Sequence, residues 1–214
     1  QTIAIGKLKV KICGSSSGLS DFGDGATHQC VEDMAIFRAV PNMTVICPAD
    51  ANETREAVKA IAQMKGPCYL RLNRNDYPNV TKEGARFEIG VPRILKHGTD
   101  VALFAAGYMT GVALEAAKEL EGSISVRVIN VSTIKPMNKE VMRKMAEGCR
   151  AVVTAEEHNV AGGLGSAVAE ALCEDPLPMK MVGIKDTFGC SGHNYQEVLA
   201  YHGLTKEAVA EAVR

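Results

Sequence analysis

Short apolar runs rich in β-branched residues alternate with amphipathic stretches along most of this sequence. The first pattern is typical of buried strands, and apolar residues that recur every three or four positions are typical of helices. Strands and helices that alternate at these lengths form right-handed β-α-β crossovers, which place the strands in a mostly parallel sheet flanked by helices. We therefore expect an α/β fold. The expected strands are 8–12, 43–47, 68–72, 100–105, 124–131, 151–155 and 179–184, and the expected helices are 31–39, 50–62, 112–120, 138–147, 164–174, 195–201 and 205–213.

A polar, turn-rich segment divides this pattern into two units. Residues 79–86 have no apolar periodicity, and the pattern restarts at Phe87. Two apolar pairs in 89–95 predict a hairpin that leads into strand 100–105. We expect two units of mostly parallel sheet flanked by helices: a first domain at 1–78, a linker at 79–86 and a second domain at 87–214.

The composition excludes several classes of protein. The chain has 24 basic and 25 acidic residues, a formal net charge of -1 and no basic cluster. Nucleic-acid and membrane-surface binding need a basic excess on one face, so neither is expected. No apolar run approaches the length of a membrane span and no signal peptide is visible at Gln1, so we expect a cytoplasmic protein. The seven cysteines form no C-x-x-C pair, which favours small core residues over a zinc site or a disulfide framework.

The loop Gly23–Gln29 (GDGATHQ) is the first place where we expect chemistry. It contains two turn glycines, the Asp24 carboxylate, a hydroxyl and the His28 imidazole, and it lies between strand 8–12 and helix 31–39. In open parallel sheets, ligands bind outside the carboxyl ends of the strands, where helix N-termini also favour anions. The motif alone is also compatible with a tight connection that has no catalytic role.

A second junction of the same kind strengthens the prediction of a site. Strand 68–72 is followed by Asn73, Arg74, Asn75 and Asp76. A single arginine is by default a solvated surface residue. However, Arg74 is expected at the same sheet edge as Asp24 and His28, and convergent polar groups from separate strand ends are typical of a site.

The clearest helix start in the sequence follows Pro48. Asp50 is a good N-cap, and Glu53 stands three residues later, where it can complete a capping box. Apolar residues then recur at helical spacing until Gly66, which is followed by Pro67. We therefore expect helix 50–62 to be well defined at its N-terminus.

Two features of the second unit have alternative interpretations. The run Gly162-Gly163-Leu164-Gly165 opens a helix, but it lacks the G-x-G-x-x-G spacing of a phosphate-binding loop, so a cofactor site there is not favoured. Glu156, Glu157 and His158 could be metal ligands or an acid/base pair. Because adjacent residues point in different directions, a surface or subunit-contact role is the favoured interpretation.

The whole sequence resembles the transketolase family. GDGATHQ (23–29) and the following VEDMAIFRAVPNMTVICPADANE (31–53) resemble the pyrimidine-binding domain of transketolases. TIKPMN (133–138), EEHNVAGGLGSAVAEAL (156–172) and DTFGCSG (186–192) resemble the transketolase C-terminal domain. The chain is similar to the separately encoded C-terminal subunit of split transketolases. Deoxyxylulose-phosphate synthases share the D-G-x-T-H-Q loop and the E-E-H run, and a non-catalytic dimerisation module of the same fold is the alternative from another class.

The resemblance implies a thiamine-diphosphate enzyme of the pentose phosphate pathway that transfers a two-carbon ketol unit between sugar phosphates. The cofactor, bound with Mg, would carry the carbanion chemistry, while the protein supplies geometry and proton transfer. By resemblance, Asp24 binds a substrate hydroxyl, His28 lies beside the reacting carbon and Arg74 binds the substrate phosphate. The family also forms homodimers.

The sequence departs from the family pattern at two points. The family usually has a second phosphate-binding histidine eight residues before the loop aspartate, and this position is Ser16. The glutamate and the aromatic residue that contact the aminopyrimidine ring are expected before residue 1, and the diphosphate- and metal-binding domain is expected on another domain or subunit. The expectation is a partial pyrimidine-binding domain followed by a C-terminal domain, inactive without its N-terminal partner.

Overall fold

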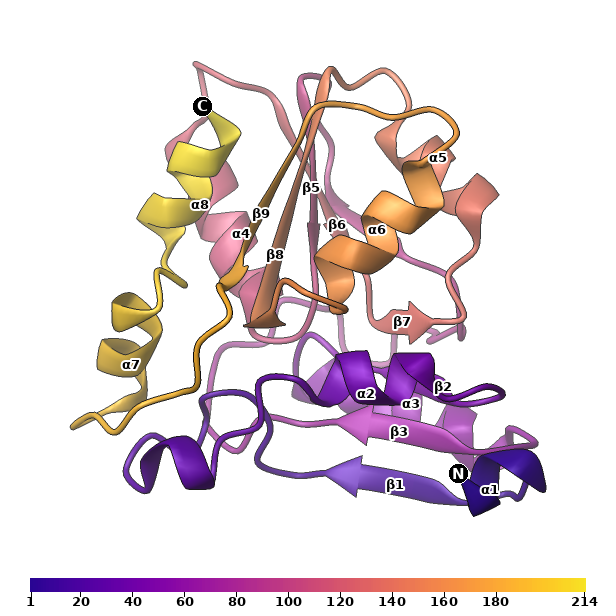
Figure 1. Ribbon diagram of the computed structural model, residues 1–214. Coiled ribbons are helices and arrows are strands. Elements are labelled where there is room, and N and C mark those ends of the chain that lie inside the picture. The colour runs from indigo at the N-terminus through magenta and orange to yellow at the C-terminus, as the bar shows by residue number, and fades with distance from the viewer.

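Parallel strands make up most of two sheets, which confirms the predicted α/β class. The computed structural model describes every residue from Gln1 to Arg214. The first sheet has the order β1-β3-β2-β7 and the second has the order β4-β6-β5-β8-β9. Figure 1 shows the first sheet in the lower half of the molecule and the second sheet above it. The strands are β1 (Lys11–Gly14), β2 (Thr44–Ile46), β3 (Cys68–Arg71), β4 (Arg93–Lys96), β5 (Val101–Ala105), β6 (Val126–Asn130), β7 (Thr133–Lys135), β8 (Ala151–Asn159) and β9 (Met179–Ile184).

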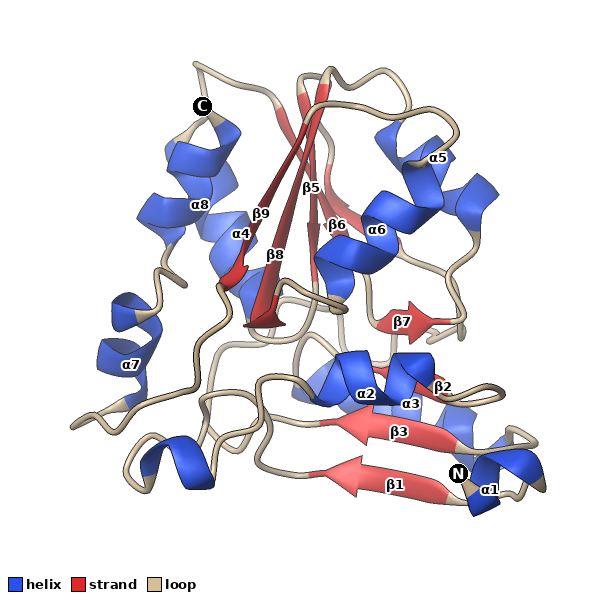
Figure 2. Cartoon of the chain, viewed as in Figure 1, coloured by secondary structure: helices blue, strands red, loops and turns tan.

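The second sheet directs its carboxyl edge toward the first. β5 is parallel to both β6 and β8, with Val101 opposite Val126 on one side and Ala151 on the other. In Figure 2 the arrowheads of β5 and β8 point down toward the first sheet. β8 continues to Asn159, beyond the predicted strand 151–155, so its polar end reaches the first unit.

Helices cover both faces of the second sheet. Leu103 faces a core that includes α4 and α8, whereas its neighbour Phe104 faces a core that includes α5 and α6. Burial on both faces explains why β5 is a continuous apolar run. None of the helices has the length and apolar character that a membrane span requires. The helices are α1 (Thr2–Ile5), α2 (Asp33–Ala39), α3 (Ala51–Gln63), α4 (Met109–Glu119), α5 (Lys139–Ala146), α6 (Leu164–Leu172), α7 (Tyr195–Tyr201) and α8 (Lys206–Val213).

The predicted start of α3 is confirmed, with one change in the capping box. The Asp50 carboxylate accepts a hydrogen bond from the Glu53 N–H at 2.9 Å, as an N-cap should. The Glu53 carboxylate accepts from the Ala49 N–H at 2.7 Å, rather than from Asp50, and also from the Asn130 side chain at 3.0 Å. Glu53 therefore joins α3 to the end of β6 in the second unit.

The hairpin predicted at 89–95 is wrong. Only Arg93–Lys96 forms a strand, and it pairs antiparallel with β6, which is distant in sequence. Ile89 instead packs against the core beneath α3. The apolar spacing in this segment reflects burial against two different partners, and spacing alone cannot distinguish such burial from a hairpin.

The strand predicted at 8–12 begins later than expected. β1 starts at Lys11, and Leu8 and Val10 are substantially exposed. The Cys68 N–H donates to the Val10 carbonyl, but the chain enters β3 from a turn at Gly66, whose φ is +87°. β3 therefore offers no partner to residues before Val10. The short helix α1 and the strand β7 were not predicted; β7 joins the first sheet antiparallel to β2.

We expect Phe104→Ala to lower the free energy of unfolding by about 3–5 kcal/mol, because the substitution empties a fully buried site in the central strand of the second sheet. Urea unfolding followed by circular dichroism measures the change. Phe188→Ala is the matched control: this side chain is 78% exposed, and its loss should change stability by no more than about 0.5 kcal/mol. Equal losses for the two variants would contradict the described core.

Candidate functional site

The predicted site residues lie in two loops at one edge of the first sheet. Ser16, Asp24 and His28 follow β1, and Arg74 follows β3. These strands are parallel neighbours, with Gly14 opposite Arg71, so their carboxyl ends are adjacent. This arrangement agrees with the expectation that the two loops share an edge.

The reactive side chains of these loops are accessible. Asp24 and His28 are exposed and flank a single 3₁₀ turn, and the Thr27 hydroxyl lies 3.1 Å from the His28 Nδ1. The Arg74 guanidinium forms an ion pair with Asp21 at 2.9 Å and remains about half exposed. The edge therefore presents a carboxylate, an imidazole and a forked cationic donor, which together can bind hydroxyl and anionic groups and transfer protons.

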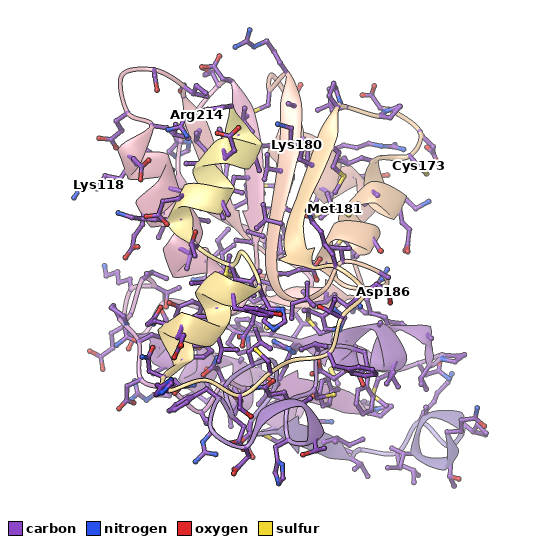
Figure 3. All side chains as sticks on the ribbon, turned by 60° about the vertical axis from the view of Figure 1, so that its left-hand side comes forward. Lys118, Cys173, Lys180, Met181, Asp186 and Arg214 are labelled. Atoms are coloured by element: carbon purple, nitrogen blue, oxygen red, sulfur yellow. The ribbon has the colours of Figure 1, made fainter.

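The first of these loops is closed at its base. Gly18 and Cys30 form an isolated antiparallel bridge, which brings the two ends of segment 19–29 together. The buried Gln29 side chain donates to the carbonyls of Asp21 at 3.1 Å and Cys190 at 3.0 Å. The loop is thus attached to the segment that leaves β9, which Figure 3 shows passing Asp186 on its way toward α7.

A buried ion pair lies directly beneath the site. The Arg71 Nε donates to the Asp33 carboxylate at 2.9 Å, and the Tyr69 hydroxyl donates to it at 2.6 Å. Burial alone would raise the pKa of Asp33, but the Arg71 charge and these hydrogen bonds outweigh burial and hold the pKa below its ordinary value. The Arg71 Nη2 also donates to the Glu157 carbonyl at 2.9 Å, so the pair joins β3, α2 and β8.

Glu156 caps helix α6 from inside the protein. Its two carboxylate oxygens accept from the N–H groups of Leu164 at 2.6 Å and Gly165 at 2.7 Å. Burial raises the pKa of Glu156 to about 8, although both N–H donors oppose this shift. The N-terminus of α6 is therefore already occupied by a carboxylate, which agrees with the view that Gly162–Gly165 is not a phosphate-binding loop.

His158 is buried in its neutral form. Its Nδ1 lies 2.6 Å from the Asn159 carbonyl, which can only accept, and its Nε2 accepts from the Ala35 N–H at 3.4 Å. Nδ1 therefore carries the proton. Burial, reinforced by the Arg71 charge, lowers the pKa of His158 to about 4. The surface or subunit-contact role favoured for Glu156, Glu157 and His158 is wrong, because all three are buried between the two units.

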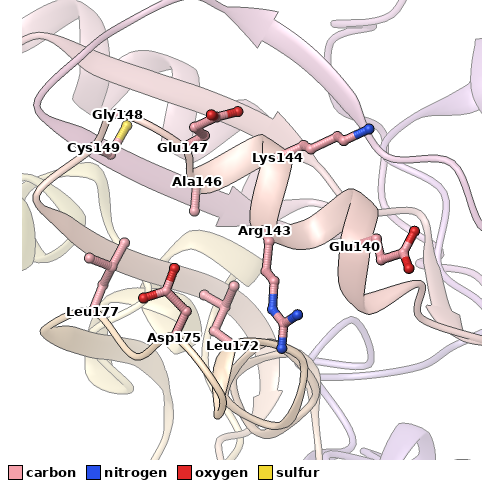
Figure 4. A pocket seen from close by; sticks show the side chains of 10 residues that line it. All are labelled: Glu140, Arg143, Lys144, Ala146, Glu147, Gly148, Cys149, Leu172, Asp175 and Leu177. Atoms are coloured by element: carbon pink, nitrogen blue, oxygen red, sulfur yellow. The ribbon is translucent and has the colours of Figure 1, made fainter.

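A groove on the second unit lies away from these loops. It has a volume of about 510 Å³ and is lined by α5, the end of α6 and the segments that precede β8 and β9 (Figure 4). Figure 4 shows Arg143, Asp175 and Leu172 around it. Because the groove is at the amino ends of β8 and β9, it is at the opposite end of the second sheet from Glu157.

Comparison with known families agrees with this geometry. The family model described as transketolase, pyrimidine binding domain, matches residues 1–80, and the model described as transketolase, C-terminal domain, matches residues 90–209. The chain belongs to the transketolase family. Within this family, the exposed loops after β1 and β3 lie in the pyrimidine-binding match, and the buried Glu156–His158 run lies in the C-terminal match.

Proteins similar to this transketolase-family chain include separately encoded sections. A protein of Methanocaldococcus jannaschii described as a transketolase C-terminal section is 42% identical over 99% of this chain and 67% of its own length. A protein of Phocaeicola vulgatus described as a subunit of an apulose-4-phosphate transketolase is 37% identical over 98% of this chain and 67% of its own length. A solved split-gene transketolase, described as an inactive β4 tetramer, is 45% identical with a TM-score of 0.91, covering 100% of this chain and 68% of that one. This chain thus spans about two thirds of each of these proteins.

One signal in the sequence could have identified the buried run at the end of β8. Three ionisable residues follow the apolar run 151–155 with no turn residue between them, and Gly162 and Gly163 come shortly afterwards. This pattern marks the run as a candidate for buried and paired charges, but it does not identify the donors that make burial favourable.

We expect stability to fall more steeply in acid for the wild type than for His158→Gln. The folded-state pKa of His158 is about 4 and its ordinary value is 6.5, so between these values the unfolded chain binds a proton that the folded chain does not. This contribution is fully present above pH 6.5 and is lost as pH falls, by about 2 kcal/mol between pH 7 and pH 5. Glu156 acts in the opposite direction in both proteins, so the difference between them isolates the histidine. Urea unfolding at the two pH values measures it, and parallel pH dependences would contradict a buried neutral His158.

Proposed function

We propose that this chain is the C-terminal part of a thiamine-diphosphate-dependent transketolase, acting on sugar phosphates together with an N-terminal diphosphate-binding domain or subunit. The observation that carries the proposal is that Asp24, His28 and Arg74 lie in loops that follow adjacent strand ends of a domain that matches the pyrimidine-binding family. The similar proteins named above are described as transketolases, which favours ketol transfer over deoxyxylulose-phosphate synthesis. We propose a cytoplasmic location and the domain division 1–78 and 87–214 as part of this assignment.

Each residue of the site has a role that follows from the chemistry of its side chain. Asp24 accepts a hydrogen bond from a substrate hydroxyl, and His28 holds or moves a proton at the hydroxyl next to the reacting carbon. Arg74 binds the substrate phosphate through its planar fork of donors, and Ser16, which follows β1, adds a neutral hydroxyl at the same sheet edge. The accessibility of Asp24, His28 and Arg74 supports a role toward substrate rather than toward the protein interior.

The residues of this chain fit only part of a cofactor site. A diphosphate is commonly held at a helix N-terminus, but the glycine-preceded N-terminus of α6 is occupied by the Glu156 carboxylate. The diphosphate and its Mg would therefore be held by the N-terminal partner, while Asp24 and His28 of this chain would act on the substrate. When bound, thiamine diphosphate supplies the carbanion chemistry.

Reconstitution tests the proposed function directly. The full-length chain is assembled with its N-terminal partner, thiamine diphosphate and Mg, and transfer of a two-carbon unit from a ketose phosphate to an aldose phosphate is followed by product analysis. Ketol transfer by the complex, with none from this subunit alone, supports the proposal. An assembled complex without turnover would favour the alternative of a non-catalytic dimerisation module.

We also propose that the subunit self-associates, as a homodimer in the active assembly. The two-fold interface is the commonest closed arrangement of soluble oligomers, and the structural neighbour described as a β4 tetramer supports self-association of such subunits. Light scattering over a range of concentrations checks this expectation, and a monomer throughout the range would count against it.

We expect Arg74→Ala to reduce kcat/KM for a phosphorylated acceptor by about one to two powers of ten, because a charge-assisted hydrogen bond contributes roughly 1.5–3 kcal/mol. Ser16→Ala should cost much less, since a neutral hydroxyl contributes about 1 kcal/mol. An unphosphorylated acceptor is the control, and Arg74→Ala should leave its kcat/KM nearly unchanged. Equal losses for both acceptors would make Arg74 a structural residue.

We expect His28→Ala to lower kcat by about 10²–10⁴-fold, the usual contribution of a positioned proton-transfer group. Because His28 is exposed, the free energy of unfolding should change by no more than about 0.5 kcal/mol. Steady-state kinetics of the reconstituted complex and urea unfolding of the same preparation give the two values. A loss of activity that only tracks a loss of folded protein would argue against a catalytic histidine.

A further inference from the structure

Glu157 reaches away from Glu156 and His158, toward the first unit. It is 3% exposed and lies near the carboxyl end of β8. Its Oε1 accepts from the Leu19 N–H at 2.7 Å, and its Oε2 accepts from the Asn73 side-chain amide at 3.1 Å. One carboxylate of the second unit thus binds two different loops of the first.

Both of these contacts are at the bases of the candidate catalytic loops. Leu19 follows Gly18, which closes the loop 19–29 that carries Asp24 and His28. Gly18 has a φ of +65°, and a Cβ at this position would overlap the Glu157 carboxylate, so only glycine permits the close approach.

The second contact is one residue before Arg74. The Asn73 Oδ1 accepts from the Asn75 N–H at 2.8 Å, and the Asn75 side chain donates to the Ser20 carbonyl at 3.0 Å. The Asn73 amide also donates to the Tyr195 hydroxyl at 2.6 Å. Arg74 therefore lies between two hydrogen-bonded asparagines. Asn73 bonds Glu157 and Tyr195 at the start of α7, and Asn75 bonds the loop that carries Asp24 and His28.

Glu157 acts in these contacts only as a hydrogen-bond acceptor. Both oxygens accept from N–H donors, and the buried Arg71 guanidinium is next to the same residue, bonded to its main-chain carbonyl. Burial raises the pKa of Glu157, whereas the Arg71 charge and the Leu19 and Asn73 donors favour its ionised form. Removing its charge would therefore weaken both contacts together.

We propose that Glu157 is a positioning residue that sets the relative placement of the loop carrying Asp24 and His28 and the loop carrying Arg74. It touches neither substrate nor cofactor and acts through Leu19 and Asn73. This inference rests on the proposed function, because it assigns catalytic purpose to the two loops. Glu157 belongs to the part of the chain that matches the C-terminal domain, so that domain takes part in organising the site of the other.

Two other buried glutamates show that burial alone does not confer this role. Glu156, the adjacent residue, caps α6 and bonds neither loop. Glu53 joins the two units through Asn130 on β6, and its other contact is Ala49, just before α3, so it bonds neither loop. Glu156→Gln is therefore the matched control, since it makes the same substitution at an equally buried position of the same strand.

Hydrogen–deuterium exchange on the full-length subunit assembled with its N-terminal partner measures the positioning directly. In Glu157→Gln we expect segments 15–30 and 73–78 to exchange at least about tenfold faster than in wild type, because the acceptor of the Leu19 N–H loses its charge and a glutamine NH2 group faces the Asn73 amide donor. Glu156→Gln should instead accelerate exchange around 162–168. If Glu157→Gln leaves both loops at wild-type rates, the proposal is overturned whether or not the complex is active.

A swap of the donor and acceptor gives a rescue test. Glu157→Gln should lower kcat/KM for ketol transfer about 10- to 100-fold through misplacement of the reacting groups. Asn73→Asp alone places two carboxylates face to face and should also lower it. In the E157Q/N73D double variant, Gln at 157 can donate to Asp at 73, accept from Leu19 and leave one negative charge beside Arg71, so kcat/KM should return to within about threefold of wild type.

The outcomes separate this inference from the proposed function. If the wild-type complex has no ketol transfer, the proposed function fails, while the exchange experiment still decides whether Glu157 positions the loops. If wild type is active and Glu157→Gln is equally active, the positioning role is overturned. If the single variant does not fold, the double variant replaces it, and a folded but inactive double variant overturns the proposal. Glu156→Gln should keep wild-type activity per folded complex, and a loss equal to that of Glu157→Gln would also overturn it.

Discussion

The ion pair between Asp33 and Arg71 is the interaction on which the arrangement of the two units depends. Both side chains are 4% exposed, and moving two charges out of water costs several kcal/mol per ion unless their remaining hydrogen-bonding groups are also satisfied. Here Tyr69 and the Glu157 carbonyl complete the set. Because Arg71 is at the end of β3 and Glu157 near the end of β8, satisfying the pair requires the carboxyl edges of the two sheets to meet. A change that separates the two units would leave the buried Arg71 Nη2 without its acceptor, the Glu157 carbonyl.

This requirement explains why loops of the first unit are held by side chains of the second. The base of the loop with Asp24 and His28 is bonded by Glu157, and its Gln29 is bonded to the Cys190 carbonyl. The reactive groups themselves remain exposed at the loop surface. A fixed base with an accessible tip would suit the proposed catalytic role, because packed elements set the geometry while the tip stays open to solvent.

Much of the architecture and of the candidate site could be predicted from the sequence. Strands such as 100–105 and helices such as 138–147 carry their own periodicity, and Asp24, His28 and Arg74 follow from the rule that parallel strands end at one edge. The hairpin at 89–95 was wrong because β4 pairs with β6, a partner that periodicity does not specify. The burial of Glu156–His158 was missed because charged residues are usually exposed, and only their partners make burial favourable.

The sequence by itself determined the α/β class, the order of most strands and helices, and the two loops where chemistry is expected, since these depend on local periodicity and on neighbours along the chain. Only the tertiary structure decided three further points. β7 completes the first sheet, Glu156 occupies the N-terminus of α6, and Glu157 joins Leu19 to Asn73. The physical reason is the cost of burying a charge. For Glu157 one of the donors is the Leu19 N–H, which is 138 residues away in the sequence, and no local pattern encodes such a distance.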